Sequence, residues 1–124
     1  MTWTYAQKTG ALSRDGVHIA DGYSGNTIGL NNPDMQDAVG VGPVPRGEYT
    51  IGPPHQPIDH LGPDALPLYP EPTNDMCGRS GFFIHGDNPR MNHTASNGCI
   101  ILGPAFRKAM VDSRDTVLVV VAGD

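Results

Sequence analysis

Glycine and proline are the residues that most constrain what this chain can fold into. The 124 residues include 16 glycines and 12 prolines, and their combined share is about twice the average usage. Both types destabilise helix interiors, which excludes a helical bundle, a coiled coil or any architecture of long helices. Disorder is disfavoured as well, because 38% of the residues are hydrophobic and only 17% are charged, and the apolar residues come in short runs bounded by turn residues. The sequence therefore predicts a compact, mainly β protein.

The length and the charge of the chain limit its organisation and its partners. A chain of 124 residues buries a single core, so we expect one domain over residues 1–124. The net charge is −5 at pH 7 and no lysine or arginine cluster occurs, which argues against nucleic acid and anionic membranes as partners. No apolar stretch approaches the roughly 20 residues that cross a bilayer, so we expect no membrane insertion. The N-terminus lacks the basic start and apolar core of a signal peptide, and we expect synthesis in the cytoplasm without one.

Residue patterns divide the chain into short elements. Alternation from Trp3 to Gln7 predicts a strand, and Asp15-Gly16 predicts a hairpin turn between strands over residues 11–12 and 17–19. Pro104 is well suited to a first helical position, and the apolar spacing after it predicts a helix over residues 104–113. The other expected elements are one helical turn over 34–39, a short strand over 47–51, a proline-rich irregular surface connection over 53–72, buried strands over 82–84 and 99–102, and a central strand over 116–122. The prediction is a small β-meander or β-sandwich with one or two short helices and long Gly/Pro-rich loops.

The segment FFIHGDNPRMNHTASNGCIIL carries the residues that favour a chemical function. A buried strand ends at His85, and 14 residues later the chain turns back into a strand at Cys99. Two strand ends can bring an imidazole and a thiol together, and a catalytic thiol, with an ordinary pKa near ~8.5, needs such a neighbour at neutral pH. Gly98 would let the backbone approach a substrate carbonyl, and the amides of Gly98 and Cys99 are candidate donors to an oxyanion. We therefore predict an acyl-transfer site with Cys99 as nucleophile and His85 as base.

The same segment resembles a known active-site signature. His85-Gly86 followed by Ser96-x-Gly98-Cys99 is similar to the signature of the L,D-transpeptidases, the YkuD-type peptidoglycan enzymes. The upstream GPVPRGEY resembles the turn and strand that precede the site in that family. More narrowly, nearly the whole chain resembles the type VI secretion L,D-transpeptidase effectors, through WTYxQxTG, GYSG with NNP, GRSGFFIHGD and SNGCIIL. The resemblance implies a small L,D-transpeptidase-like fold.

The resemblance implies a reaction and a set of partners. Cys99 would attack the bond between the third residue of a peptidoglycan stem peptide, commonly meso-diaminopimelate, and the terminal D-alanine, forming a thioester without a cofactor or metal. Water then gives L,D-carboxypeptidase activity, and an incoming D-amino acid gives exchange. Such a protein is an antibacterial toxin, which the type VI secretion machinery delivers into the periplasm of rival bacteria. We expect a cognate immunity protein that covers the Cys99 cleft.

The resemblance also implies roles for residues around this pair. The carbonyl of Gly86 would orient the imidazole, and Ser96 would contact the substrate or stiffen the turn. Tyr23 lies in a segment similar to the substrate-facing loop of the effectors, although turn formation explains that segment almost as well. Asp87 would cap the turn after His85 or assist the imidazole.

Two positions depart from the general family pattern. The family often has histidine before the Gly-Cys pair and arginine two residues after the cysteine, where this chain has Asn97 and Ile101. Hydrolysis or exchange is therefore expected rather than general transpeptidation. Recognition of substrate carboxylates must come from other residues, with Asn97 counted among the substrate contacts and three arginines as candidate cations: Arg79, Arg90 and Arg107.

Other interpretations of these residues stay open. Cys77 is expected to be structural or incidental, and a Cys77–Cys99 disulfide would block the nucleophile. A zinc site formed by His85, His93 and Cys99 is an alternative, although it lacks the closely spaced ligand pairs of typical zinc sites. A non-catalytic cell-wall-binding module on the same scaffold, or another His/Cys thiol protease, would also fit the sequence.

Overall fold

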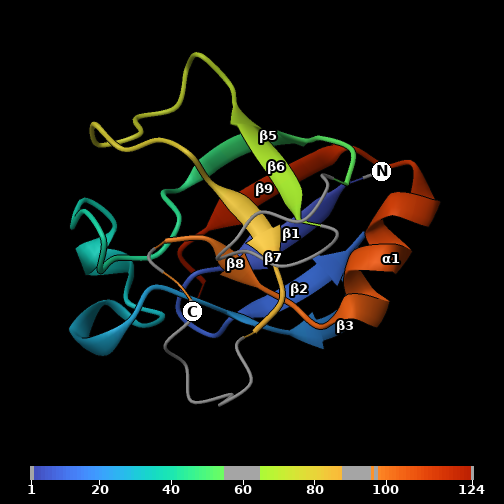
Figure 1. Cartoon of the computed structure of the whole chain (residues 1–124), viewed down its shortest axis with the longest axis horizontal. Coiled ribbons are helices and arrows are strands. Elements are labelled where there is room, and N and C mark those ends of the chain that lie inside the picture. The colour runs from blue at the N-terminus through green and yellow to red at the C-terminus, as the bar shows by residue number, and fades with distance from the viewer. Residues whose placement is uncertain (1, 55–64, 88–95, 97, 124) are drawn as a thin grey trace.

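The computed structural model describes residues 2–54, 65–87, 96 and 98–123 of the chain. These residues form nine strands, one α-helix and two short 3-10 turns (Figure 1). In chain order the elements are β1 (Trp3–Ala6), β2 (Ala11–Arg14), β3 (Val17–Asp21), β4 (Tyr23–Ser24), η1 (Thr27–Gly29), η2 (Pro33–Met35), β5 (Gly47–Ile51), β6 (Leu66–Pro70), β7 (Phe83–His85), β8 (Ile100–Ile101), α1 (Pro104–Ser113) and β9 (Val117–Val121). The prediction of a mainly β fold is confirmed.

The strands form one nearly closed sheet. Their order is β3-β2-β1-β9-β5-β6-β7-β8-β4, and the two edge strands, β3 and β4, are separated in the chain by Gly22 alone. The Gly22 N–H donates to the Gly10 carbonyl at 2.8 Å, while a Cβ at Gly22 would collide with the Ile101 carbonyl oxygen. Position 22 has no room for a side chain. A glycine there lets β3 and β4, which follow each other in the chain, form the two edges of the sheet. This closure brings Tyr23 beside β8.

The sheet encloses one hydrophobic core, which holds its strands in register. Fully buried aromatic and aliphatic side chains from most strands contribute to it, among them Trp3, Tyr5, Leu12, Tyr49, Ile84, Ile100 and Leu118. The alternation predicted for the first strand is confirmed, since Trp3 and Tyr5 are buried in β1. The predicted hairpin is confirmed too, because Asp15 and Gly16 both have positive φ between β2 and β3, as this turn type requires.

The helix α1 occupies the predicted residues and lies at one side of the molecule. Figure 1 shows it opposite the Gly/Pro-rich segment that follows β4. Pro104 is in its first turn, and Arg114 ends it in the left-handed conformation. Its buried residues are Met110 and Arg107, whereas Phe106 is partly exposed. Among the described residues, no helix has the length and hydropathy needed to cross a membrane.

Some predicted boundaries were wrong. Strand β6 lies inside the stretch 53–72 that was expected to be irregular. Its Pro67 has no N–H to donate, but its carbonyl accepts from Gly52 N at 2.8 Å and the neighbouring Leu68 N donates to Phe82 O at 2.9 Å. The turn expected over 34–39 is the shorter η2. The last strand, β9, is an interior strand between β1 and β5, as a run of apolar residues predicts.

Candidate active site

Strands β7 and β8 place His85 and Cys99 on the same face of the sheet. The two strands are parallel, with Ile84 opposite Ile100. His85 is the last residue of β7 and Cys99 immediately precedes β8. Continuing the register by one residue puts Cys99 opposite Phe83, and side chains alternate along a strand. His85 and Cys99 therefore share the face opposite Ile84 and Ile100, which point into the core.

His85 is held in an orientation suited to a base. The side chain is buried, and its Nδ1 lies 2.9 Å from the Gly86 carbonyl oxygen. A carbonyl only accepts, so this contact requires the proton to sit on Nδ1 of the neutral ring. The lone pair is then on Nε2. The Gly86 carbonyl thus makes the contact that the resemblance implies.

Ser96 organises the turn that leads to Cys99. Its fully buried Oγ donates to the Cys99 carbonyl at 2.5 Å and accepts from Gly25 N at 2.9 Å and Gly98 N at 3.1 Å. These bonds fix the turn and engage the Gly98 amide inside it. Of the two roles considered for Ser96, stiffening the turn matches this geometry. Asn97 lies outside the described residues, so its predicted contact with substrate has no structural account.

A segment far away in the sequence supports the same turn. Ser24 Oγ donates to the Gly98 carbonyl and accepts from Val44 N, both at 2.9 Å. Asn26 Nδ2 donates to the Ser96 carbonyl at 2.8 Å. The sequence did not predict this role for Ser24 or Asn26. A hydroxyl or amide side chain in a Gly-rich loop can bond to many backbone groups, and the sequence does not indicate which distant turn it contacts.

Arg79 lies directly behind the turn. Its guanidinium donates to the carbonyls of Gln36 at 2.7 Å, Pro43 at 2.8 Å and Gly42 at 3.1 Å, and it stacks on the Phe82 ring at 5.1 Å. A Cβ at Gly98, whose φ is +134°, would collide with the same guanidinium. Gly98 is therefore required by its conformation and by the packing of Arg79, rather than by substrate approach alone.

The surroundings of Cys99 disfavour its thiolate form. Burial raises the pKa of Cys99, while a hydrogen bond with the Phe83 backbone and the charge of Arg79 lower it. The burial effect is the largest, so the net pKa lies above that of an ordinary thiol. Attack by this thiol would therefore require proton transfer to a base, the role that the sequence predicts for His85.

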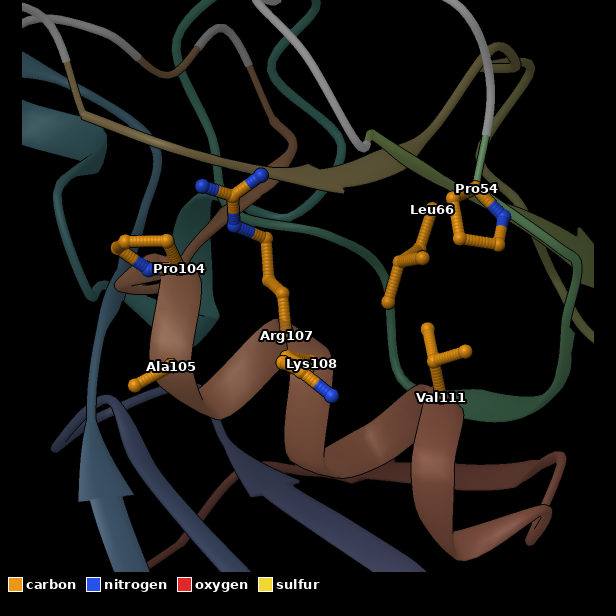
Figure 2. A pocket seen from close by; sticks show the side chains of 7 residues that line it. All are labelled: Pro54, Leu66, Pro104, Ala105, Arg107, Lys108 and Val111. Carbon is orange, nitrogen blue, oxygen red and sulfur yellow. The ribbon is translucent and has the colours of Figure 1, made fainter.

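The polar residues beyond His85 border a cavity of about 700 Å³. Tyr23 Oη donates to Asp87 Oδ1 at 2.7 Å, which ties β4 to the turn after β7. Both residues line this cavity together with Gly86, Ile101 and Arg107. A second cavity of about 470 Å³ shares Arg107 and is more apolar. Figure 2 shows that Arg107 extends away from α1, between Pro104 on one side and Leu66 and Pro54 on the other.

The remaining candidates are the second cysteine, the zinc alternative and Arg90. Both Cys77 and Cys99 are free thiols, so no disulfide blocks Cys99. Among the described residues, no group of three His, Cys, Asp or Glu side chains is arranged for a metal ion. The zinc alternative stays untested, because His93 is outside those residues, as is Arg90.

Comparison with known families identifies the domain. A family model described as the Tlde1 domain matches residues 18–124, which include every candidate site residue. No curated protein matches the chain.

Proposed function

This chain belongs to the Tlde1 domain family of type VI secretion L,D-transpeptidase effectors, and from that premise we propose that it is a cysteine-dependent L,D-carboxypeptidase and D-amino acid exchange enzyme. Its substrate is the tetrapeptide stem of peptidoglycan. The observation that carries the proposal is that His85, held through Nδ1 by the Gly86 carbonyl, ends the strand that pairs in parallel with β8, which Cys99 immediately precedes. We propose that the reaction follows the YkuD-type mechanism, in which the cysteine forms a thioester with the stem peptide.

The first half-reaction forms a thioester. His85 Nε2 takes the proton from Cys99 Sγ as the sulfur attacks the carbonyl carbon of the third stem residue. The carbonyl oxygen becomes an oxyanion, and the backbone N–H of Cys99 is the proposed donor to it, because the Gly98 amide is engaged by Ser96 Oγ. The bond to D-alanine then breaks, and the proton on Nε2 passes to the leaving amine.

The second half-reaction releases the enzyme. A water molecule gives a proton to His85 and attacks the thioester carbon, and Cys99 leaves as a thiolate that recovers the proton. The product is a tripeptide stem. When the amine of a D-amino acid attacks instead, the product is a stem with an exchanged terminal residue. Either outcome removes the tetrapeptide donors that ordinary cross-linking uses, which suits an antibacterial toxin.

The other site residues have supporting roles in this proposal. Arg79 engages three backbone carbonyls, so we assign it to positioning of the Cys99 turn instead of substrate binding. Tyr23 and Asp87, which bond to each other, are proposed to line the substrate cleft. We further propose that the protein acts in the periplasm of target bacteria after type VI secretion, and that a cognate immunity protein covers the Cys99 cleft in the producing cell.

The test is muropeptide analysis after incubation of purified protein with peptidoglycan sacculi. Wild type should convert tetrapeptide stems to tripeptides, and should exchange the terminal residue when a D-amino acid is added. Cys99→Ala should abolish both products, whereas the matched control Cys77→Ala should keep them. Unchanged muropeptides with folded wild-type protein would contradict the proposal and favour a binding module, and cleavage of casein without action on sacculi would favour a thiol protease.

A further inference from the structure

The cavity beside His85 carries charges of both signs. Arg107 lines it from α1, Asp21 from the end of β3 and Asp87 from the turn after β7. Gly86, whose carbonyl orients His85, is also part of its wall. The cavity is therefore adjacent to the proposed base, and its charged groups come from three separate elements.

Arg107 is fixed in this cavity from two sides. The residue is only 7% exposed, and its Nε donates to the Leu102 carbonyl at 3.1 Å. A Cβ built at Gly86 would lie 2.9 Å from Arg107 Nη2, so the guanidinium rests on the backbone next to His85. A buried, positioned guanidinium is the side chain best suited to bind a carboxylate. Ile101, at the position where the general family pattern has arginine, lines the same cavity.

Asp21 and Asp87 supply the negative charges of the cavity. Asp87 accepts a hydrogen bond from Tyr23 Oη at 2.7 Å, and Asp21 pairs with His18 at 2.9 Å. Each carboxylate has two oxygens, and both accept hydrogen bonds. The cavity thus combines a fixed cation with acceptors suited to an ammonium group.

We propose that this cavity is a subsite for an α-amino-acid zwitterion, with Arg107 binding the carboxylate and the aspartates facing the ammonium group. The inference rests on the proposed function, because that reaction offers two sources of such a group. One is the free end of the third stem residue's side chain when that residue is a diamino acid with two carboxylates. The other is the free D-amino acid that acts as acceptor in exchange.

The first experiment measures binding without chemistry. In a Cys99→Ala background, titration calorimetry with a soluble tetrapeptide should show a Kd that rises roughly 10- to 100-fold on Arg107→Met, the loss expected for a charge-assisted hydrogen bond to a carboxylate. Lys108→Met is the matched control, since Lys108 is the next residue of α1 and is exposed, with its amine paired to Asp112 at 2.7 Å. Arg107→Lys should recover part of the affinity, because it restores the charge but not the planar fork.

The second experiment identifies the source of the zwitterion. If the stem side chain binds here, amidation of its distal carboxylate should raise the KM of wild type by the same factor as Arg107→Met, should add nothing in that variant, and should leave kcat nearly unchanged. If the acceptor binds here, hydrolysis should be normal and exchange with D-methionine should fall in Arg107→Met, as should wild-type exchange with D-methioninamide.

Each result has a defined meaning. Arg107→Met that matches Lys108→Met in affinity, KM and exchange would overturn the subsite. Should Arg107→Met fail to fold, as its thermal unfolding would reveal, wild type that is indifferent both to amidation of the stem and to D-methioninamide would overturn it equally. Processing that survives Cys99→Ala would sink the proposed reaction, yet the calorimetric difference between the Arg107 and Lys108 variants would still report on the subsite.

Discussion

Cys77 and Cys99 are both free, partly buried thiols beside a glycine with positive φ, yet their surroundings differ. Burial raises the pKa of each thiol. The carboxylates of Asp75 and Asp37 raise the pKa of Cys77 further, and the charges of Arg79 and Arg46 lower it, whereas the other influences on Cys99, from the Phe83 backbone and Arg79, all lower its pKa. Cys99 alone adjoins a strand whose neighbour ends in a histidine. The two thiols thus differ in the groups that the fold places around them, although both are partly buried.

The glycines beside the two cysteines differ in the same sense. Gly78 has a φ of +71° and nothing within 4 Å of where a Cβ would lie. Gly98 has a φ of +134°, and the corresponding space is filled by Arg79 and Phe82. The Cys77 turn is therefore open and locally determined, while the Cys99 turn is enclosed by residues from distant parts of the chain.

Removing the imidazole of His85 should have the largest effect on the difference in reactivity between Cys99 and Cys77. His85→Gln should lower stem hydrolysis roughly 10²- to 10⁴-fold, the range expected for loss of a general base. It should also slow alkylation of Cys99 at pH 7 and leave alkylation of Cys77 unchanged, as measured by mass spectrometry of labelled peptides. Equal slowing of both thiols would mean that the substitution acts through global stability and not through proton transfer.

Adding one methyl group next to each cysteine should lower the free energy of unfolding by different amounts at the two turns. Gly98→Ala combines an unfavourable φ with a collision against Arg79 and should cost about 2–4 kcal/mol of unfolding free energy. Gly78→Ala carries only the unfavourable φ and should cost about 1–2 kcal/mol. Denaturant unfolding of both variants gives the comparison, and equal losses would show that the enclosure of Gly98 contributes nothing.

Removing the charge behind Cys99 should have a smaller effect that depends on pH. The charge of Arg79 lowers the pKa of both Cys99 and Cys77, so Arg79→Met should raise both pKa values and move both alkylation profiles to higher pH. Arg46, an exposed residue whose charge lowers the pKa of Cys77, provides the control.

Arg46→Met should move the profile of Cys77 to higher pH without moving that of Cys99. Arg79→Met should in addition destabilise the fold, because three backbone carbonyls lose their donor. A Cys99 profile that does not move in folded Arg79→Met protein would refute the electrostatic role of Arg79.

The sequence predicted those features that depend on neighbouring residues. The Asp15-Gly16 turn, the helix that starts at Pro104 and the apolar strand before Ala122 are set by local turn chemistry and periodicity, and all three are present. The positions of His85 at one strand end and Cys99 at the start of another were also readable, because each adjoins an apolar run. Strand β6 was not predicted, because its prolines lack an N–H donor and are typical of loops. Only the pairing with neighbouring strands shows which of its backbone groups need hydrogen-bond partners.

Only the tertiary structure decided how the candidate site is supported. Nothing local in the sequence distinguishes Arg79, which donates to the segment 36–43 behind the Cys99 turn, from Arg107, which rests on Gly86 beside His85. Both arginines are separated in sequence from most of the groups they contact. The sequence by itself thus determined a β-rich chain with a histidine and a cysteine at strand ends. The closure of the sheet at Gly22 and the long-range hydrogen bonds determined which charges lie beside them, because such contacts depend on distances that no sequence spacing specifies.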